Sequence, residues 1–311
     1  MGNTFEFLDK SIKTEKAIPS EKKIRQAINR GDATVILYLI NNGLLNPSAP
    51  DEYGDTPLHV ACFNGHEESI VKFLIEKGAN VDASNEDGKT PLSRACCKGH
   101  ESIVKLLIEN GANINILDKD GHTPLFWACY FDHDSIVKLL IAKGANVNIP
   151  AKDGQTPLFQ ACRSKHDSIA KLLIEKGANV NTPDNDGQIP LHVACYFEHN
   201  SIVKLLIEKG ANINISDKGG RTPLYVACLN GYNSIVQLLL KKGAWITKEL
   251  KEEFPETLTL GYHIQQTLGF LYWTRKSNPN SVFGVNYLPR DMFNLIIYFY
   301  ITQEKIDDLY L

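Results

Sequence analysis

Residues 118–150 read DKDGHTPLFWACYFDHDSIVKLLIAKGANVNIP, and closely similar units lie on both sides of them. The Thr-Pro-Leu motif of this unit has a counterpart in six copies, which begin at Thr56 and end at Thr222. Successive motifs are separated by 34, 33, 33, 33 and 33 residues, and Ile189 replaces the threonine in the fifth copy. A fixed period between about 20 and 50 residues predicts an architecture of stacked repeats.

Local rules predict two short helices in each unit. Thr123 is a good N-cap, Pro124 suits the first helical position, and this helix is expected to end near residues 132–133. A second helix is expected from about Ser135, with apolar residues at helical spacing, and Gly144 suits its left-handed end. Helices this short are unstable alone, so neighbouring units must cover one another.

The unit resembles the ankyrin repeat, most closely in GDTPLH at 54–59 and IVKLLIEKGANIN at 202–214. The resemblance implies an all-α ankyrin-repeat solenoid of stacked helix-turn-helix units with β-hairpin-like loops. Residues 51–249 hold the six copies, and residues 21–50 keep the two-helix rhythm without Thr-Pro-Leu, as expected of a degenerate capping repeat. Residues 1–20 are expected to form an N-terminal tail, and residues 250–311 a small helical C-terminal segment.

Composition excludes several classes of partner. The net charge is −3, from 33 basic and 36 acidic residues, which gives no basic footprint for nucleic acid. No apolar stretch reaches the roughly 20 residues of a membrane span, and the first residues lack an apolar signal core. We therefore expect a monomer in the cytoplasm, with the nucleus as a second location.

Cysteine and histidine recur at fixed places in the repeat. Of the seven cysteines, Cys97 stands apart. The other six share one position of the repeat: Cys62, Cys96, Cys129, Cys162, Cys195 and Cys228. A small thiol that fills each repeat interface explains them without disulfides. Five histidines share another position, where we expect bonds to turn backbone within the same repeat: His66, His100, His133, His166 and His199. No metal site, cofactor, catalytic residue or enzymatic activity is predicted.

The residues that vary between copies are expected to face the partner. In proteins that this sequence resembles, ligands lie on the concave side and touch the loop tips and the exposed side of the first helix. Aromatic residues and arginine dominate interface hot spots. Our candidate partner-binding residues are therefore Phe63, Trp127, Tyr130, Phe131, Arg163, Tyr196, Phe197 and Tyr225. The alternative is that some of these rings pack under neighbouring loops.

The C-terminal segment carries a second hypothesis. Leu288-Pro289 followed by an acidic residue and an apolar helix with Met292, Leu295 and Ile296 resembles the start of an F-box. Such segments follow ankyrin repeats in a family of poxvirus proteins, where they recruit a cullin ubiquitin ligase. The segment is also similar to a SOCS box, which recruits a different cullin.

The predicted function is thus a protein-interaction scaffold that recruits substrates to a cullin-ligase adaptor subunit. The alternative is a plain scaffold or structural linker whose C-terminal helices only cap the stack.

Overall fold

The computed structural model describes residues 26–28, 30–255 and 258, and the chain forms two compact units, Met1–Val226 and Ala227–Leu311. The described helices of the first unit are α3 (Ala33–Asn41), α4 (Pro57–Asn64), α5 (Glu68–Glu76), α6 (Pro91–Lys98), α7 (Glu101–Glu109), α8 (Pro124–Tyr130), α9 (Asp134–Ala142), α10 (Pro157–Arg163), α11 (Asp167–Glu175), α12 (Pro190–Tyr196) and α13 (Asn200–Glu208). The unit boundary falls within α14 (Pro223–Leu229), and the second unit holds α15 (Asn233–Lys241) and α16 (Lys248–Glu253). The described residues include no β-strand, so the fold is all-α as predicted.

The first helix of each repeat begins as the Thr-Pro motif predicts. The Thr123 hydroxyl accepts a hydrogen bond from the Phe126 N–H at 3.1 Å, and the helix continues from Pro124. Where histidine occupies the third helical position, its ring joins the cap: His192 Nδ1 accepts the Ile189 N–H at 3.2 Å, as His59 Nδ1 accepts the Thr56 N–H at 3.1 Å. The helix α8 ends at Tyr130, slightly before the predicted end.

The second helix buries one apolar face. In α9 the buried residues are Ile136, Val137 and Leu140, at the spacing expected of an amphipathic helix. Gly144 follows with φ 94°, a left-handed conformation that ends the helix and favours glycine.

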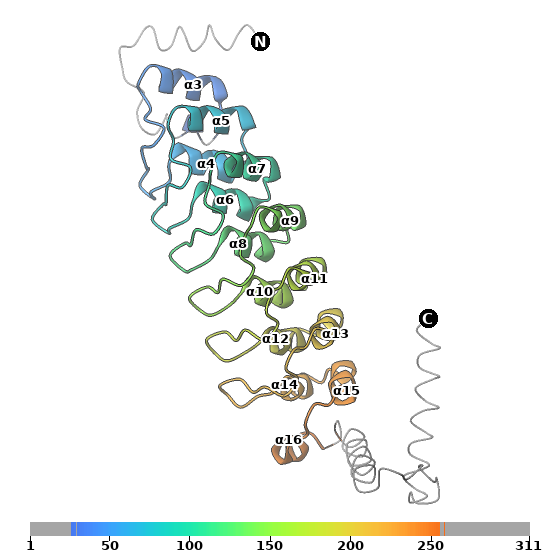
Figure 1. The fold of residues 1–311 in the computed structure, drawn as a ribbon. Helices are drawn as coiled ribbons and strands as arrows, with labels where there is room; N and C mark the ends of the chain where they lie inside the picture. Colours follow the sequence, from blue (N-terminus) through green and yellow to red (C-terminus); the bar gives the residue numbers. More distant parts are fainter. Residues whose placement is uncertain (1–25, 29, 256–257, 259–311) are drawn as a thin grey trace, which may run out of the picture. The chain divides into compact units, whose positions relative to one another are not determined.

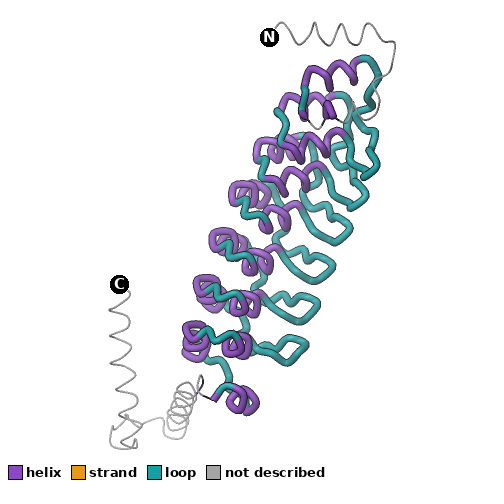
Figure 2. The backbone as a smooth tube through the Cα atoms, turned by 180° about the vertical axis from the view of Figure 1, so that it is seen from behind, coloured by secondary structure: helices purple, strands orange, loops and turns teal. Residues whose placement is uncertain are grey.

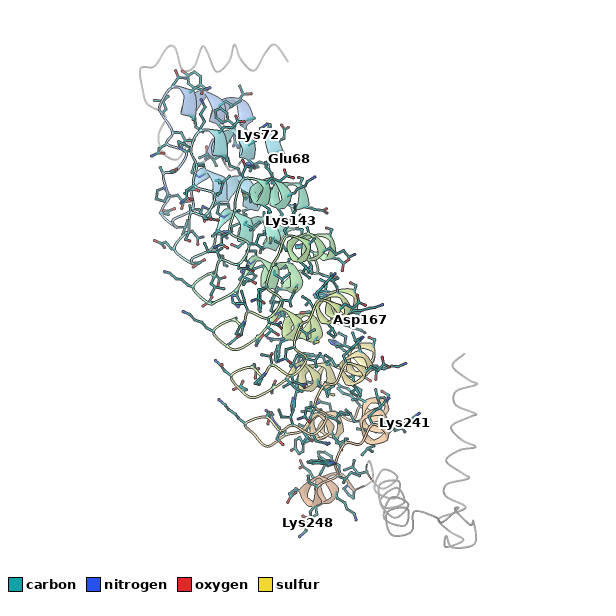
Figure 3. The ribbon with its side chains drawn as sticks, viewed as in Figure 1. Glu68, Lys72, Lys143, Asp167, Lys241 and Lys248 are labelled. Carbon is teal, nitrogen blue, oxygen red and sulfur yellow. The ribbon has the colours of Figure 1, made fainter. Side chains whose placement is uncertain are left out.

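Stacking arranges the helices of the first unit in two rows. The inner row holds α4, α6, α8, α10 and α12, and the outer row holds α5, α7, α9, α11 and α13. Each helix packs against its neighbours in the same row, and each inner helix packs against the outer helix that follows it. Figures 1 and 2 show the connecting loops projecting from the inner row, on the side away from the outer row. Figure 3 shows charged side chains such as Glu68 and Lys72 on the outer row.

The predicted hairpin-like loops are tight turns that bond to one another rather than strands. The Asp118 N–H donates to the His122 carbonyl at 3.1 Å across one turn. The Lys119 N–H donates to the Asp87 carbonyl of the preceding loop at 2.8 Å. Backbone bonds therefore join consecutive loops as well as closing each one.

Polar side chains also join consecutive repeats. The Asn148 amide oxygen accepts from the Asn179 N–H at 2.9 Å, while its Nδ2 donates to the Gly177 carbonyl at 3.0 Å. The histidines act in the same way, and here our expectation of bonds within one repeat is wrong. His100 Nε2 donates to the carbonyl of Phe63, 37 residues earlier, at 3.2 Å. The imidazole is long enough to cross the interface because the stacked inner helices lie close together.

The cysteines fill these interfaces, as predicted. Cys62, Cys96, Cys129, Cys162 and Cys195 are fully buried and Cys228 is nearly so, and all of them are free thiols. Burial raises the pKa of each, in Cys228 to about 12, so these thiols stay protonated and unreactive. Cys97 is only half-buried, yet burial raises its pKa as well.

We expect acidification below about pH 6.5 to destabilise the stack. Burial lowers the pKa of His59 and His192 below the usual histidine value of about 6.5. The neutral rings use both nitrogens: His192 Nδ1 accepts the Ile189 N–H, and Nε2 donates to the Arg221 carbonyl at 3.0 Å. Since the unfolded chain takes up these protons more readily than the folded one, stability is full above pH 6.5 and falls as the pH drops below it.

Urea unfolding followed by circular dichroism at pH 7.5, 6.5 and 5.5 would measure this effect as a falling midpoint. The double variant His59→Gln/His192→Gln should show a smaller fall over the same range. A wild-type midpoint that stays constant from pH 7.5 to 5.5 would contradict the prediction.

Candidate partner-binding face

One position of the inner helix, the seventh after the Thr-Pro threonine position, forms a column along the stack. It holds Tyr130 at the end of α8, Arg163 at the end of α10 and Tyr196 at the end of α12. Because α8 packs against α10 and α10 against α12, the three side chains lie on neighbouring helices along one surface. Tyr130 is 45% exposed and Tyr196 54% exposed, and Arg163 is also exposed. The structure therefore brings these three predicted residues together.

A phenylalanine follows each tyrosine and widens this surface. The rings of Tyr130 and Phe131 meet edge to face with centroids 4.8 Å apart, and those of Tyr196 and Phe197 do so at 4.9 Å. Both phenylalanines stack on the histidine two positions later in their own repeat and remain 43% exposed. These contacts hold the rings in place while leaving large apolar areas open to solvent. We call the surface of Tyr130, Phe131, Arg163, Tyr196 and Phe197 the ring face.

Trp127 lies beside the ring face but has structural partners of its own. Its Nε1 donates to Asp118 Oδ2 at 3.0 Å, and the Lys89 ammonium lies 4.6 Å from its ring centroid. Trp127 also contacts Tyr130 and Phe131, with centroids 6.0 and 6.2 Å away. Its half-buried ring therefore supports Tyr130 and Phe131 from behind.

Two other predicted residues are placed differently. Phe63 occupies the same column at the other end of the stack but is half-buried, with the Lys98 ammonium 4.4 Å and the Arg94 guanidinium 5.2 Å from its ring centroid. Tyr225 lies in the third position after the threonine, where Phe159 is only 2% exposed, and it is partly buried. Tyr225 is therefore not in the column of exposed rings.

Three residues next to the ring face were not among those predicted from the sequence. Asp132, Lys165 and Glu198 have φ values of 61°, 62° and 59°, a left-handed conformation that is costly for residues other than glycine. Other repeats place Gly65, Gly99 or another glycine there. The signal was present in the sequence as the loss of glycine from three consecutive copies.

A side chain at this position changes the contacts of the next repeat's histidine. A Cβ on Gly65 would lie 2.3 Å from His100 Cε1, so that histidine requires glycine before it. In the repeat that follows Asp132, the His166 ring turns so that its Nδ1 lies 3.1 Å from the Asp132 carboxylate. After Lys165, His199 uses Nδ1 instead of Nε2 and donates to the Cys162 carbonyl at 2.8 Å. The central repeats thus rearrange an interface contact in order to carry a charged residue here.

Asp118, Asp120 and His122 offer a possible set of cation ligands, with ligand atoms within 4.8 Å of one another. The Asp118 carboxylate already has structural partners, because it accepts the Asp120 and His122 N–H groups and the Trp127 Nε1–H. This cluster serves the turn, so we assign it no metal.

Comparison with known proteins identifies the repeats. The family model described as ankyrin repeats (3 copies) matches residues 24–118, 111–184 and 181–249, which is more than half of the 311 residues. The chain belongs to the ankyrin-repeat family. The matches begin within the repeat that the sequence predicted to be degenerate.

Similar proteins share only part of their length with this ankyrin-repeat chain. Over 64 residues it is 36% identical to human protein phosphatase 1 regulatory subunit 27, covering 21% of this chain and 40% of that protein. Over 82 residues it is 33% identical to the ankyrin repeat, SAM and basic leucine zipper domain-containing protein 1 of Callithrix jacchus, covering 26% and 17%. Over 77 residues it is 36% identical to the palmitoyltransferase akr1 of Emericella nidulans, covering 24% and 10%. The chain spans less than half the length of each relative.

The F-box-like residues Leu288, Pro289, Met292, Leu295 and Ile296 lie outside the described residues. Among the helices that the structure describes, none is long and apolar enough to cross a bilayer.

Proposed function

We propose that this ankyrin-repeat chain is a non-catalytic scaffold that binds a protein partner on the ring face. The observation that carries the proposal is the variation at one position of the inner helix. The ring face places Tyr130, Arg163 and Tyr196 there, whereas an equivalent repeat carries Cys97. Because the same position accepts a thiol, a guanidinium or a ring, the stack does not require tyrosine there.

The chemistry of the face suits protein binding. Its rings are held by edge-to-face contacts, so little side-chain freedom is lost when a partner covers them. Large, pre-positioned aromatic side chains and arginine are the residues that dominate binding energy at protein interfaces. One similar protein is named as a regulatory subunit of protein phosphatase 1, which is itself a function based on protein binding.

The double variant Tyr130→Ala/Tyr196→Ala is expected to bind its partner at least tenfold more weakly. Tyrosine is a common hot-spot residue at protein interfaces, where truncation to alanine costs about 2 kcal/mol or more of binding free energy. Both side chains are about half exposed, so the free energy of unfolding should change by only about 0.5 kcal/mol per site. Quantitative affinity capture from the source cells, with thermal unfolding measured in parallel, tests both expectations.

Tyr38→Ala provides a matched control. Tyr38 lies on α3, which packs against the outer-row helix α5, and is 39% exposed, so this variant also removes one exposed tyrosine ring. The control should retain every partner. If the double variant unfolds instead of losing partners, the rings belong to the core. If it retains all partners, the ring face is not the binding surface.

The recruitment of a cullin-ligase subunit stays a prediction from the sequence. Alanine at both Leu288 and Pro289 extends the same capture experiment to this question. Cullin subunits should be lost from this variant while partners that depend on the rings are kept. Absence of cullin complexes from the wild-type capture would leave the plain scaffold as the function.

A further inference from the structure

The charges of the ring face indicate what kind of segment it holds. We propose that its partner is an extended protein segment with one carboxylate side chain between two large apolar side chains. This inference rests on the proposed function, because it names the chemistry of the partner for the same face.

The middle repeat supplies two positive charges. Arg163 and Lys165 are both exposed, and neither forms an ion pair with any residue in the described part of the chain. In contrast, Arg94 is paired with Asp55 at 2.8 Å, and Arg221 with Asp217 at 2.8 Å. A guanidinium without a partner, between two pairs of rings, is suited to bind a carboxylate through charge-assisted hydrogen bonds.

The repeats on either side carry negative charges at the equivalent position. Asp132 follows the first ring pair and Glu198 follows the second, while Lys165 lies between them. The charges along the stack therefore alternate negative, positive, negative. A segment that is acidic throughout would be repelled at both ends, so the carboxylate must lie over the middle repeat and apolar side chains over the rings.

The spacing of the helices fixes the spacing along the segment. The helices α8 and α12 are separated by α10, and packed helices lie about 8–10 Å apart, which puts the two ring pairs about 16–20 Å apart. A segment in the extended polyproline II conformation advances about 3.1 Å per residue and places every third side chain on the same side. The two apolar side chains should therefore be about six residues apart, with the carboxylate about three residues from each.

The backbone provides a separate reason to link these three repeats. Among the described residues, those other than glycine with positive φ are Asp132, Lys165 and Glu198, in three consecutive repeats. Left-handed backbone costs about 1–2 kcal/mol per residue when a side chain is present. Such conformations gather at functional sites, where they place a side chain that glycine would not supply. The three repeats that form the ring face are the ones that carry this backbone strain among the described residues.

Panning a phage-displayed library of random 12-residue peptides on the full chain tests the proposal, with depletion on the Tyr130→Ala/Tyr196→Ala variant. Retained peptides should carry Asp or Glu with a large apolar residue about three positions away on each side. Panning on Arg163→Glu should select Lys or Arg in place of the acid. The control Lys171→Glu makes the same charge change at an exposed position of the outer-row helix α11 in the same repeat, and it should select the wild-type pattern.

A synthetic peptide with the selected pattern gives the quantitative test. Glu→Gln at its centre should weaken binding to the wild type about tenfold, as expected for loss of a charge-assisted hydrogen bond, and should change binding to Arg163→Glu less than twofold or improve it. Two outcomes would overturn this inference and keep the proposed function. The peptides that depend on the rings could lack the acid, or panning on Arg163→Glu could recover peptides with the same acid. Failure to recover any peptide that depends on the rings would count against both.

Discussion

Leu158→Ala is expected to lower the free energy of unfolding by about 3–5 kcal/mol. Leu158 is fully buried in α10, which packs against α8 and α12 in its own row and against α11 in the outer row. The substitution removes three carbons from a site that neighbouring repeats cover on both sides. Because each repeat stabilises only its neighbours, the cavity weakens two interfaces at once.

Urea unfolding monitored by circular dichroism measures this loss, and the transition of Leu158→Ala should also become less cooperative. Leu117→Ala is the matched control. Leu117 is 48% exposed in a loop between repeats, so its loss should cost only about 0.5 kcal/mol. A loss below about 1 kcal/mol for Leu158→Ala would mean that the stack collapses around the cavity, which would contradict the prediction.

Gly65→Ala is expected to cost about 2–3 kcal/mol, although it adds a single methyl group. Gly65 has φ 70°, for which a side chain costs about 1–2 kcal/mol. The added Cβ would lie 2.3 Å from His100 Cε1, so the imidazole must move and give up its bond to the Phe63 carbonyl. Loss of that bond adds about 1 kcal/mol.

Gly78→Ala separates these two causes. Gly78 has φ 87°, and a Cβ there would meet nothing within 4 Å, so only the backbone cost applies. Urea midpoints of the two variants should therefore differ, with Gly65→Ala the less stable. Equal midpoints would show that the histidine moves aside without cost and that its bond across the repeats contributes little.

Much of the fold follows from local rules that can be read from residues close in the chain. A threonine before proline suits the start of a helix, and a glycine at positive φ suits its end, so the two helices of each unit were predictable from motifs that recur with the repeat. The burial of the shared cysteine position followed from the repeat itself. The exposure of Tyr130, Arg163 and Tyr196 was also predictable, since positions that vary between copies of a stack are those that the neighbours do not constrain.

Other features could not be predicted from one copy of the repeat. The half-burial of Phe63 depends on two cations from the next repeat, Arg94 and Lys98. Tyr225 was grouped with the exposed rings because it is aromatic and on a first helix, yet its position in the helix turns it toward the buried side. Asp132 looked like an ordinary turn residue, and only its φ of 61° shows that it occupies a position of glycine.

The sequence by itself determined the repeated helix pair, the stacking of the copies and the small residues at their interfaces, because these depend on periodicity and on contacts within a few residues. Only the tertiary structure decided which side chains join consecutive repeats. His100 bonds to a residue 37 positions away in the chain, and Asn148 bonds to one 31 positions away. It also decided that rings, cations and left-handed residues of three repeats share one surface. That arrangement exists only after the repeats have stacked, since stacking brings residues of successive copies within contact distance.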